Sequence, residues 1–65
     1  MQNKRGMTVT DRLEQDIEYA KNTANATHRE LLALKVLGAA DFAVEFGLIT
    51  NQQWELYIDR IFKLI

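Results

Sequence analysis

The chain has 65 residues with no Cys, no Pro and no Ser, and its 8 basic and 9 acidic side chains give a formal net charge of -1. This length allows one domain, the lack of Cys excludes disulfides and thiolate metal sites, and the basic stripe of a general nucleic-acid binder is missing. A domain this small barely offsets the entropy lost on folding, so we expect association with a second copy or a partner to contribute to its stability.

The sequence shows no membrane or secretion signal. No apolar run approaches the roughly 18 residues that a bilayer span requires. The N-terminal MQNKRGMTV carries positive charges but lacks the apolar block of a signal peptide. These features predict a cytoplasmic protein with a flexible tail over residues 1–9 and one helical domain over residues 10–65.

Helical patterns begin with a predicted first helix over residues 10–24, capped by Thr8 or Thr10. Its apolar seam has spacings of four, three and four residues and consists of Leu13, Ile17, Ala20 and Ala24. The segment 22–27 is poor in helix formers, and Thr27 with Glu30 fits a capping box. A break is therefore predicted at residues 24–27, and one continuous helix over residues 11–46 is the alternative.

The second helix, predicted over residues 28–46, is apolar around nearly its whole circumference. Such a helix is normally buried, and two short neighbours in one chain can hardly cover it. We therefore expect a homodimer or larger homo-oligomer, with folding and assembly as a single event. Gly38 either marks a close helix crossing or is simply tolerated. The predicted oligomer interface comprises Leu32, Val36, Ala39, Ala43, Phe46, Ile58, Ile61 and Phe62.

A turn and a third helix complete the predicted fold. Gly47 suits the left-handed position just after a helix, and Thr50 with Gln53 fits a second capping box. The third helix, predicted over residues 51–64, carries its apolar and charged residues on opposite sides, and the short link makes it antiparallel to the second helix. The predicted fold class is all-α, a helical hairpin or three-helix unit assembling as a homo-oligomer.

Catalysis is not expected from these residues. The chain has no Ser or Cys nucleophile, and its single His, His28, has no further metal ligands at a suitable spacing. Carboxylates four residues apart, such as Asp41 and Glu45, fit a solvated helix face better than an acid–base pair. No cofactor and no metal are expected.

The turn also fits the outline of a DNA-reading helix-turn-helix, in which an Ala precedes the turn Gly by four residues and a capped helix follows. Ala43, Gly47 and Thr50 match that outline, although Thr50 comes one residue late. Three side chains able to read base edges begin the third helix: Asn51, Gln52 and Gln53. The predicted third helix has no net charge, whereas a helix that contacts DNA phosphates needs positive charge. A plain hairpin needs the same residues, and a helix-turn-helix-like transcriptional regulator is the alternative.

The stretch GLITNQQW, residues 47–54, resembles the Gly-x-Ile-Thr turn of the short helical tail domains called SHOCT. Those domains usually have Glu where Gln53 stands and a basic residue near Ile58, and this chain departs from them at both positions. The resemblance implies an interaction module without catalysis.

The sequence therefore predicts a small non-enzymatic adaptor, inhibitor or regulator that binds another protein. Small helical proteins of this kind are common among the products of phage and mobile elements. One part of the predicted partner surface is an acidic strip on the second helix, Glu30, Asp41 and Glu45. The other part lies on the first helix, away from its seam, and comprises Arg12, Asp16 and the isolated aromatic Tyr19.

Overall fold

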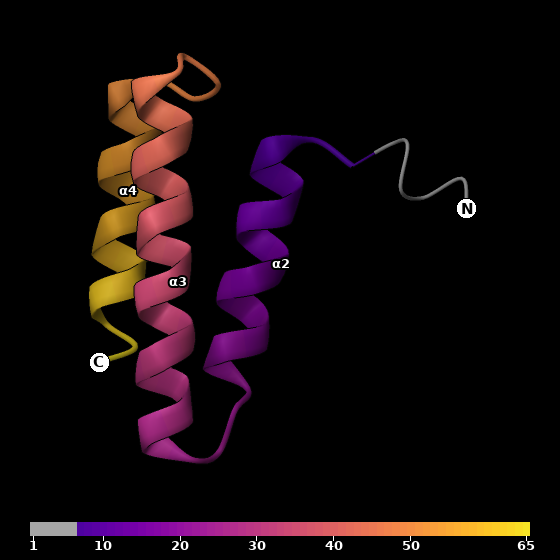
Figure 1. Cartoon of the computed structure of the whole chain (residues 1–65), viewed down its shortest axis with the longest axis vertical. Helices are drawn as coiled ribbons and strands as arrows, with labels where there is room; N and C mark the ends of the chain where they lie inside the picture. Colours follow the sequence, from indigo (N-terminus) through magenta and orange to yellow (C-terminus); the bar gives the residue numbers. More distant parts are fainter. Residues whose placement is uncertain (1–6) are drawn as a thin grey trace.

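A computed structural model describes residues 7–65. Within this range the chain forms three α-helices and no strand: α2 (Val9–Lys21), α3 (Ala26–Glu45) and α4 (Asn51–Phe62). The helices lie side by side in a slab of 30 × 30 × 14 Å (Figure 1), and α3 packs against both of the others. The predicted all-α class with three helices is confirmed. Most of the predicted tail, including Lys4 and Arg5, lies outside the described residues.

Helix α2 begins at a capping box. Thr8 Oγ1 accepts a hydrogen bond from Asp11 N at 3.1 Å, and Asp11 Oδ2 accepts one from Thr8 N at 3.2 Å. Two backbone N–H groups that the first helical turn cannot pair are thereby satisfied. The cap is Thr8 rather than Thr10, so the helix starts one residue earlier than predicted, and it ends at Lys21, three residues short of the prediction.

The chain breaks between α2 and α3, as predicted, but a different residue caps the second helix. Asn25 Oδ1 accepts a hydrogen bond from His28 N at 2.8 Å, and α3 already includes Thr27 and Glu30. The predicted capping box of Thr27 and Glu30 is therefore wrong, and so is the alternative of one continuous helix. Asn is among the strongest N-cap residues because its short side chain reaches the free backbone N–H groups of the first turn.

The turn after α3 is closed by two backbone hydrogen bonds. Leu48 N donates to Ala43 O at 2.8 Å, and Gly47 N donates to Val44 O at 3.2 Å, which is the pattern of a Schellman motif. Gly47 has a φ of 73°, so the predicted left-handed glycine is confirmed. Ile49, which the sequence pattern did not single out, is the turn residue that enters the core, with 5% of its surface exposed.

Helix α4 starts with the predicted capping box. Thr50 Oγ1 accepts from Gln53 N at 3.0 Å, and Gln53 Oε1 accepts from Thr50 N at 2.8 Å. The helix then runs antiparallel to α3 (Figure 1) and ends at Phe62, two residues before the predicted end.

Replacing Gly47 with Ala should destabilise the chain by about 1 kcal/mol, because an L-residue in the left-handed region brings its Cβ close to a backbone carbonyl. Gly38→Ala is the matched control and should stabilise the chain by about 1 kcal/mol, because Ala is the better helix former and nothing lies within 4 Å of an added Cβ. Urea unfolding of both variants measures whether each substitution raises or lowers the free energy of unfolding. Shifts in the same direction would contradict this description of the turn.

The core consists of small residues of α3 enclosed by larger residues of its neighbours. Ala33 and Ala40 are fully buried, and the largest fully buried side chains are Leu13 of α2 and Ile61 of α4. Alanines at these positions let both flanking helices approach α3 closely. The predicted seam of the first helix is buried except for Ala24, which falls in the break. The full buried set is Leu13, Ile17, Ala20, Ala33, Val36, Ala40, Ala43, Ile49, Tyr57 and Ile61.

Arg29 joins three segments at the end of the fold where α2 is linked to α3. Its Nε donates to Leu64 O at 3.2 Å and its Nη1 donates to Thr23 O at 3.0 Å. One half-buried guanidinium thus joins the start of α3 to the α2–α3 link and to the residues after α4, which limits how far the three helices can separate at this end.

Candidate interaction surfaces

Helix α3 keeps large apolar side chains in solvent after folding. Leu31, Leu34, Phe42 and Phe46 are 58, 47, 57 and 65% exposed. The neighbouring helices cover only the alanine-rich side of α3, where all its buried residues lie. Such exposed apolar surface is typical of sites that bind another molecule.

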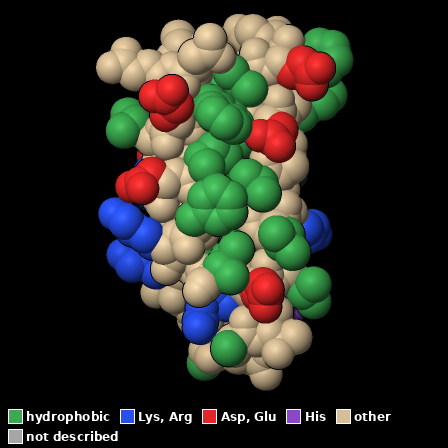
Figure 2. Space-filling view, turned by 90° about the vertical axis from the view of Figure 1, so that its left-hand side faces the viewer, with side chains coloured by type: hydrophobic (Ala, Val, Ile, Leu, Met, Phe, Trp, Pro, Cys, Tyr) green, Lys and Arg blue, Asp and Glu red, His purple; other side chains and the backbone are tan. Residues whose placement is uncertain are grey.

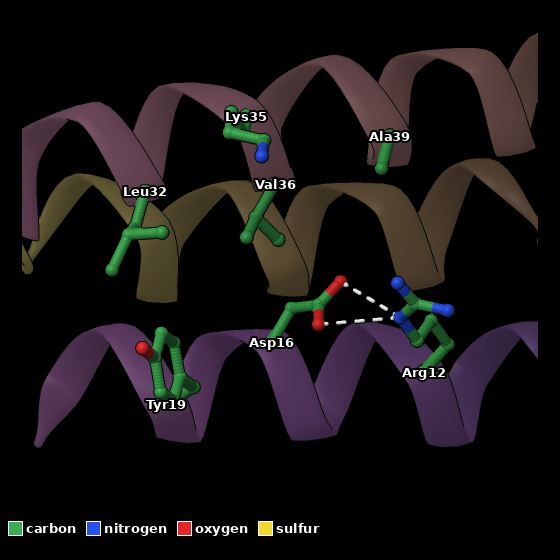
Figure 3. A pocket seen from close by; sticks show the side chains of 7 residues that line it. All are labelled: Arg12, Asp16, Tyr19, Leu32, Lys35, Val36 and Ala39. Carbon is green, nitrogen blue, oxygen red and sulfur yellow. Dashed lines mark hydrogen bonds and ion pairs between the residues drawn. The ribbon is translucent and has the colours of Figure 1, made fainter.

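A groove of about 390 Å³ separates α2 from α3 on one side of the fold (Figure 3). Its lining residues are Arg12, Asp16 and Tyr19 from α2 and Leu32, Lys35, Val36 and Ala39 from α3. Leu32 and Val36 point from α3 toward α2 (Figure 3). Arg12 Nε lies 3.3 Å from both carboxylate oxygens of Asp16, so these two charges neutralise each other beside the apolar lining residues.

An apolar seam extends this groove along α3. Its residues follow one another at alternating spacings of three and four, the spacing used by paired helices. We call them the groove seam: Leu32, Lys35, Ala39, Phe42 and Phe46. The rings of Phe42 and Phe46 have centroids 4.5 Å apart, so the seam ends at an exposed pair of contacting aromatic rings.

A second apolar surface lies on the α3–α4 hairpin and is turned away from α2 (Figure 2). Trp54 Nε1 donates to Asp41 Oδ1 at 2.7 Å, which sets the register of the two antiparallel helices. Counting along the two antiparallel helices from this contact places Ile58 near the level of Leu37 and Phe62 near the level of Leu34. We call this surface the outer strip: Leu34, Leu37, Trp54, Ile58, Phe62 and Ile65.

Carboxylates border the outer strip on both of its helices, as the acidic side chains on either flank in Figure 2 show. They are Glu30, Asp41 and Glu45 of α3 and Glu55 and Asp59 of α4. Asp59 pairs with Lys63 at 3.3 Å, whereas within residues 7–65 Glu30, Glu45 and Glu55 have no ion-pair partner. This surface therefore combines an apolar centre with uncompensated negative charge.

An ion pair between Glu14 and Arg60 joins α2 to α4. Glu14 Oε2 accepts a hydrogen bond from Arg60 Nη1 at 2.7 Å, which lowers the pKa of Glu14 and raises the pKa of Arg60. The same guanidinium lies over the ring of Tyr57, 5.9 Å from its centroid, and burial followed by the Glu14 charge raises the pKa of that phenol. Each shift favours the charge state that the group already has at neutral pH, so the ion pair between Glu14 and Arg60 holds α2 against α4.

Replacing Glu14 with Gln should reduce the free energy of unfolding by about 0.2–1 kcal/mol at neutral pH, the range for exposed ion pairs. Because the folded pKa of Glu14 is lowered, the contribution is present above the ordinary value of 4.5 and is lost as pH falls through the folded pKa. Thermal melts of the parent and the variant should therefore converge on acidification.

The control for this prediction is Glu55→Gln, which removes a carboxylate without an ion pair among the described residues. The difference in melting temperature between Glu55→Gln and the parent should not shrink in the same way as the pH falls. If the difference for Glu14→Gln persists unchanged in strong acid, the contact with Arg60 is not its source.

The predicted oligomer interface is divided among the core and both surfaces. Val36, Ala43 and Ile61 are at most 4% exposed and belong to the chain's own core. The other five remain accessible at least in part: Leu32, Ala39 and Phe46 on the groove seam, and Ile58 and Phe62 on the outer strip. The predicted interface residues that remain accessible therefore belong to two separate surfaces.

The two parts of the predicted partner surface also lie apart. Arg12, Asp16 and Tyr19 border the groove, whereas the acidic strip of Glu30, Asp41 and Glu45 borders the outer strip. The sequence reasoning missed Leu34 and the exposed Leu56. A signal for Leu34 was present, because it follows Glu30 by four residues and precedes Asp41 by seven, which places it on the acidic side of the helix.

The residues of the DNA-binding alternative form the exposed first turn of α4: Asn51, Gln52 and Gln53. Gln53 uses its side-chain oxygen to cap the helix. Helices α3 and α4 run antiparallel in Figure 1, whereas a helix-turn-helix crosses its two helices at about 90–120°. The geometry is that of a hairpin.

Over residues 7–65, no helix has the length and apolar composition needed to cross a membrane, and no three His, Asp or Glu side chains are grouped to hold a metal ion.

The likeness of residues 47–54 to SHOCT domains is not supported by a family match. Compared with known protein families, curated proteins and solved structures, the chain matches none of them.

Proposed function

We propose that the chain is a small non-catalytic, cytoplasmic protein-binding module, an adaptor, inhibitor or regulator of another protein, that acts as a helical homo-oligomer. The observation that carries this proposal is the apolar surface left after folding. Ten large apolar side chains among residues 7–65 are 39 to 65% exposed. Exposed apolar side chains that line up with one another, as on the groove seam and the outer strip, are typical of protein contact surfaces.

Self-association is proposed along the groove seam. Leu32, Ala39 and Phe42 repeat at the spacing of helix pairs, and the neighbouring Arg12 and Asp16 neutralise each other. Lys35 is the single charged residue within the seam, and one such residue commonly fixes the register of a helix pair at some cost in stability. Two copies of the outer strip would instead bring uncompensated carboxylates together.

Partner binding is proposed on the remaining apolar surface, the outer strip. This division leaves each α3 helix between a second copy on one side and the partner on the other. It also explains why α3 is apolar on so much of its circumference although only its alanine-rich side is buried within the chain.

Affinity capture from a lysate of the source cells, with and without nuclease, tests the proposed function. We expect a stoichiometric protein partner that survives nuclease, is lost with Leu34→Asp and is retained with Leu56→Asp. Leu56 is the matched control because it is exposed on α4 but lines a different surface, beside Glu14 and Arg60. Retention of DNA alone, lost steeply as salt rises, would contradict the proposal and favour the helix-turn-helix alternative.

A further inference from the structure

Within residues 7–65, the α3–α4 hairpin is covered by a helix on only one side. Helix α2 packs against α3 and is joined to α4 through Glu14 and Arg60. On the opposite side, hydrophobic side chains run along the face seen in Figure 2. Leu34, Phe62 and Ile65 of the outer strip are 47, 56 and 54% exposed. A further helix placed there would cover the hairpin on its second side.

The length of the outer strip fits one short helix. From Trp54 to Phe62 the strip follows α4 for about 12 Å, and the turn residues up to Ile65 extend it to a length of about three helical turns. A helix lying between α3 and α4 would set apolar residues three and four positions apart against Leu34, Ile58 and Trp54, in the manner of helices that bind along an apolar surface. Trp54 is suited to anchor such a contact because its indole N–H is already satisfied by Asp41.

The charges around the outer strip indicate which side chains a helix that binds there should carry. Glu30 and Glu45 on one flank and Glu55 on the other have no ion-pair partner within residues 7–65. A partner helix with Lys or Arg on both sides of its apolar stripe would meet negative charge on both flanks. A second copy of this strip, a nucleic acid or an anionic membrane would bring like charges together.

From the uncovered side, its length and its charge, we propose that the outer strip binds a basic amphipathic helix of the partner protein. This inference rests on the proposed protein-binding function and adds the chemistry of the partner. The apolar centre supplies most of the affinity, and the carboxylates select the basic helix and align it along the strip.

Tryptophan fluorescence of the full chain tests the proposal, because Trp54 is its only Trp and lies in the outer strip. The probe is a synthetic amphipathic peptide of about 14 residues, enough for the strip's three turns, made of Leu at helical spacing and Lys elsewhere. The control peptide has Glu in place of every Lys. We expect the lysine peptide to shift Trp54 emission saturably to shorter wavelength, and the glutamate peptide to leave it unchanged.

Variants locate the binding on the strip. Leu34→Asp should weaken binding of the lysine peptide by at least about 10-fold, because it replaces an exposed apolar side chain of the strip with a carboxylate. Changing Glu30, Glu45 and Glu55 together to Gln should weaken it several-fold and reduce its salt dependence. All three carboxylates are exposed, so this variant keeps the fold. Leu56→Ala, at an exposed position on a different surface of α4, is the matched control and should leave the affinity unchanged.

Equal binding of the two peptides, binding of neither, or full affinity in both strip variants would overturn the inference. The proposed function would survive each of these results if the chain self-associates and captures a protein partner that resists nuclease. Conversely, selective binding of the lysine peptide by a chain that stays monomeric would support the inference and overturn the proposed homo-oligomer.

Discussion

Replacing Ala43 with Glu should abolish the helical fold. Ala43 is 2% exposed, so its replacement would bury an unpaired carboxylate and force extra volume into a close-packed site, at a cost of several kcal/mol. A chain of this size is stable by only about 3–10 kcal/mol. Far-ultraviolet circular dichroism at room temperature should show the loss of most of the helical signal.

Ala39→Glu is the matched control, one helical turn earlier on α3. Ala39 is exposed on the groove seam, so this variant should keep its helices while losing self-association. From the sequence pattern alone, Glu at either Ala39 or Ala43 would be expected to unfold the chain and dissociate the oligomer together. Loss of helix in both variants would show that folding requires assembly, and a folded Ala43→Glu variant would contradict the described core.

Replacing Ile61 with Ala should lower the melting temperature by about 10 °C or more. Ile61 has no exposed surface, and removing such a buried side chain costs about 2–5 kcal/mol, with each kcal/mol worth about 4–8 °C in a small domain. Leu56→Ala, at a position 63% exposed on the same helix, should change stability by less than about 0.5 kcal/mol. Equal melting temperatures for the two variants, followed by circular dichroism, would contradict the packing of α4.

Local rules account for much of what could be predicted of the fold. Thr50 with Gln53, and Gly47 after α3, follow capping rules that depend on a few adjacent residues, and the structure confirms them. The missed cap shows the limit of those rules. Asn25 and Thr27 are both good N-caps, and the choice between them moves the helix start by only two residues.

The side of α3 that faces the core could not be predicted from hydrophobicity. Phe42 and Phe46 are the larger apolar residues, yet they are exposed, whereas Ala33 and Ala40 are fully buried. Close packing against two helices at once favours small side chains on the shared side. That requirement arises from the tertiary arrangement, which a helical pattern read along one segment does not contain.

The candidate surfaces were predicted in parts, because their assembly depends on contacts between distant segments. The acidic residues of α3 were singled out, but their association with Ile58 and Phe62 follows from the register that the Trp54–Asp41 hydrogen bond sets across 13 residues of chain. In the same way, Tyr19 and Leu32 meet at one groove only because α2 packs against that side of α3.

The molecular mass in solution tests the central claim, a helical homo-oligomer, most directly. Sedimentation equilibrium at micromolar concentration should give at least twice the 7.5 kDa of one chain, and the mass should fall to that of one folded chain in the Ala39→Glu variant. A parent chain that sediments as a single 7.5 kDa species at that concentration would contradict the account.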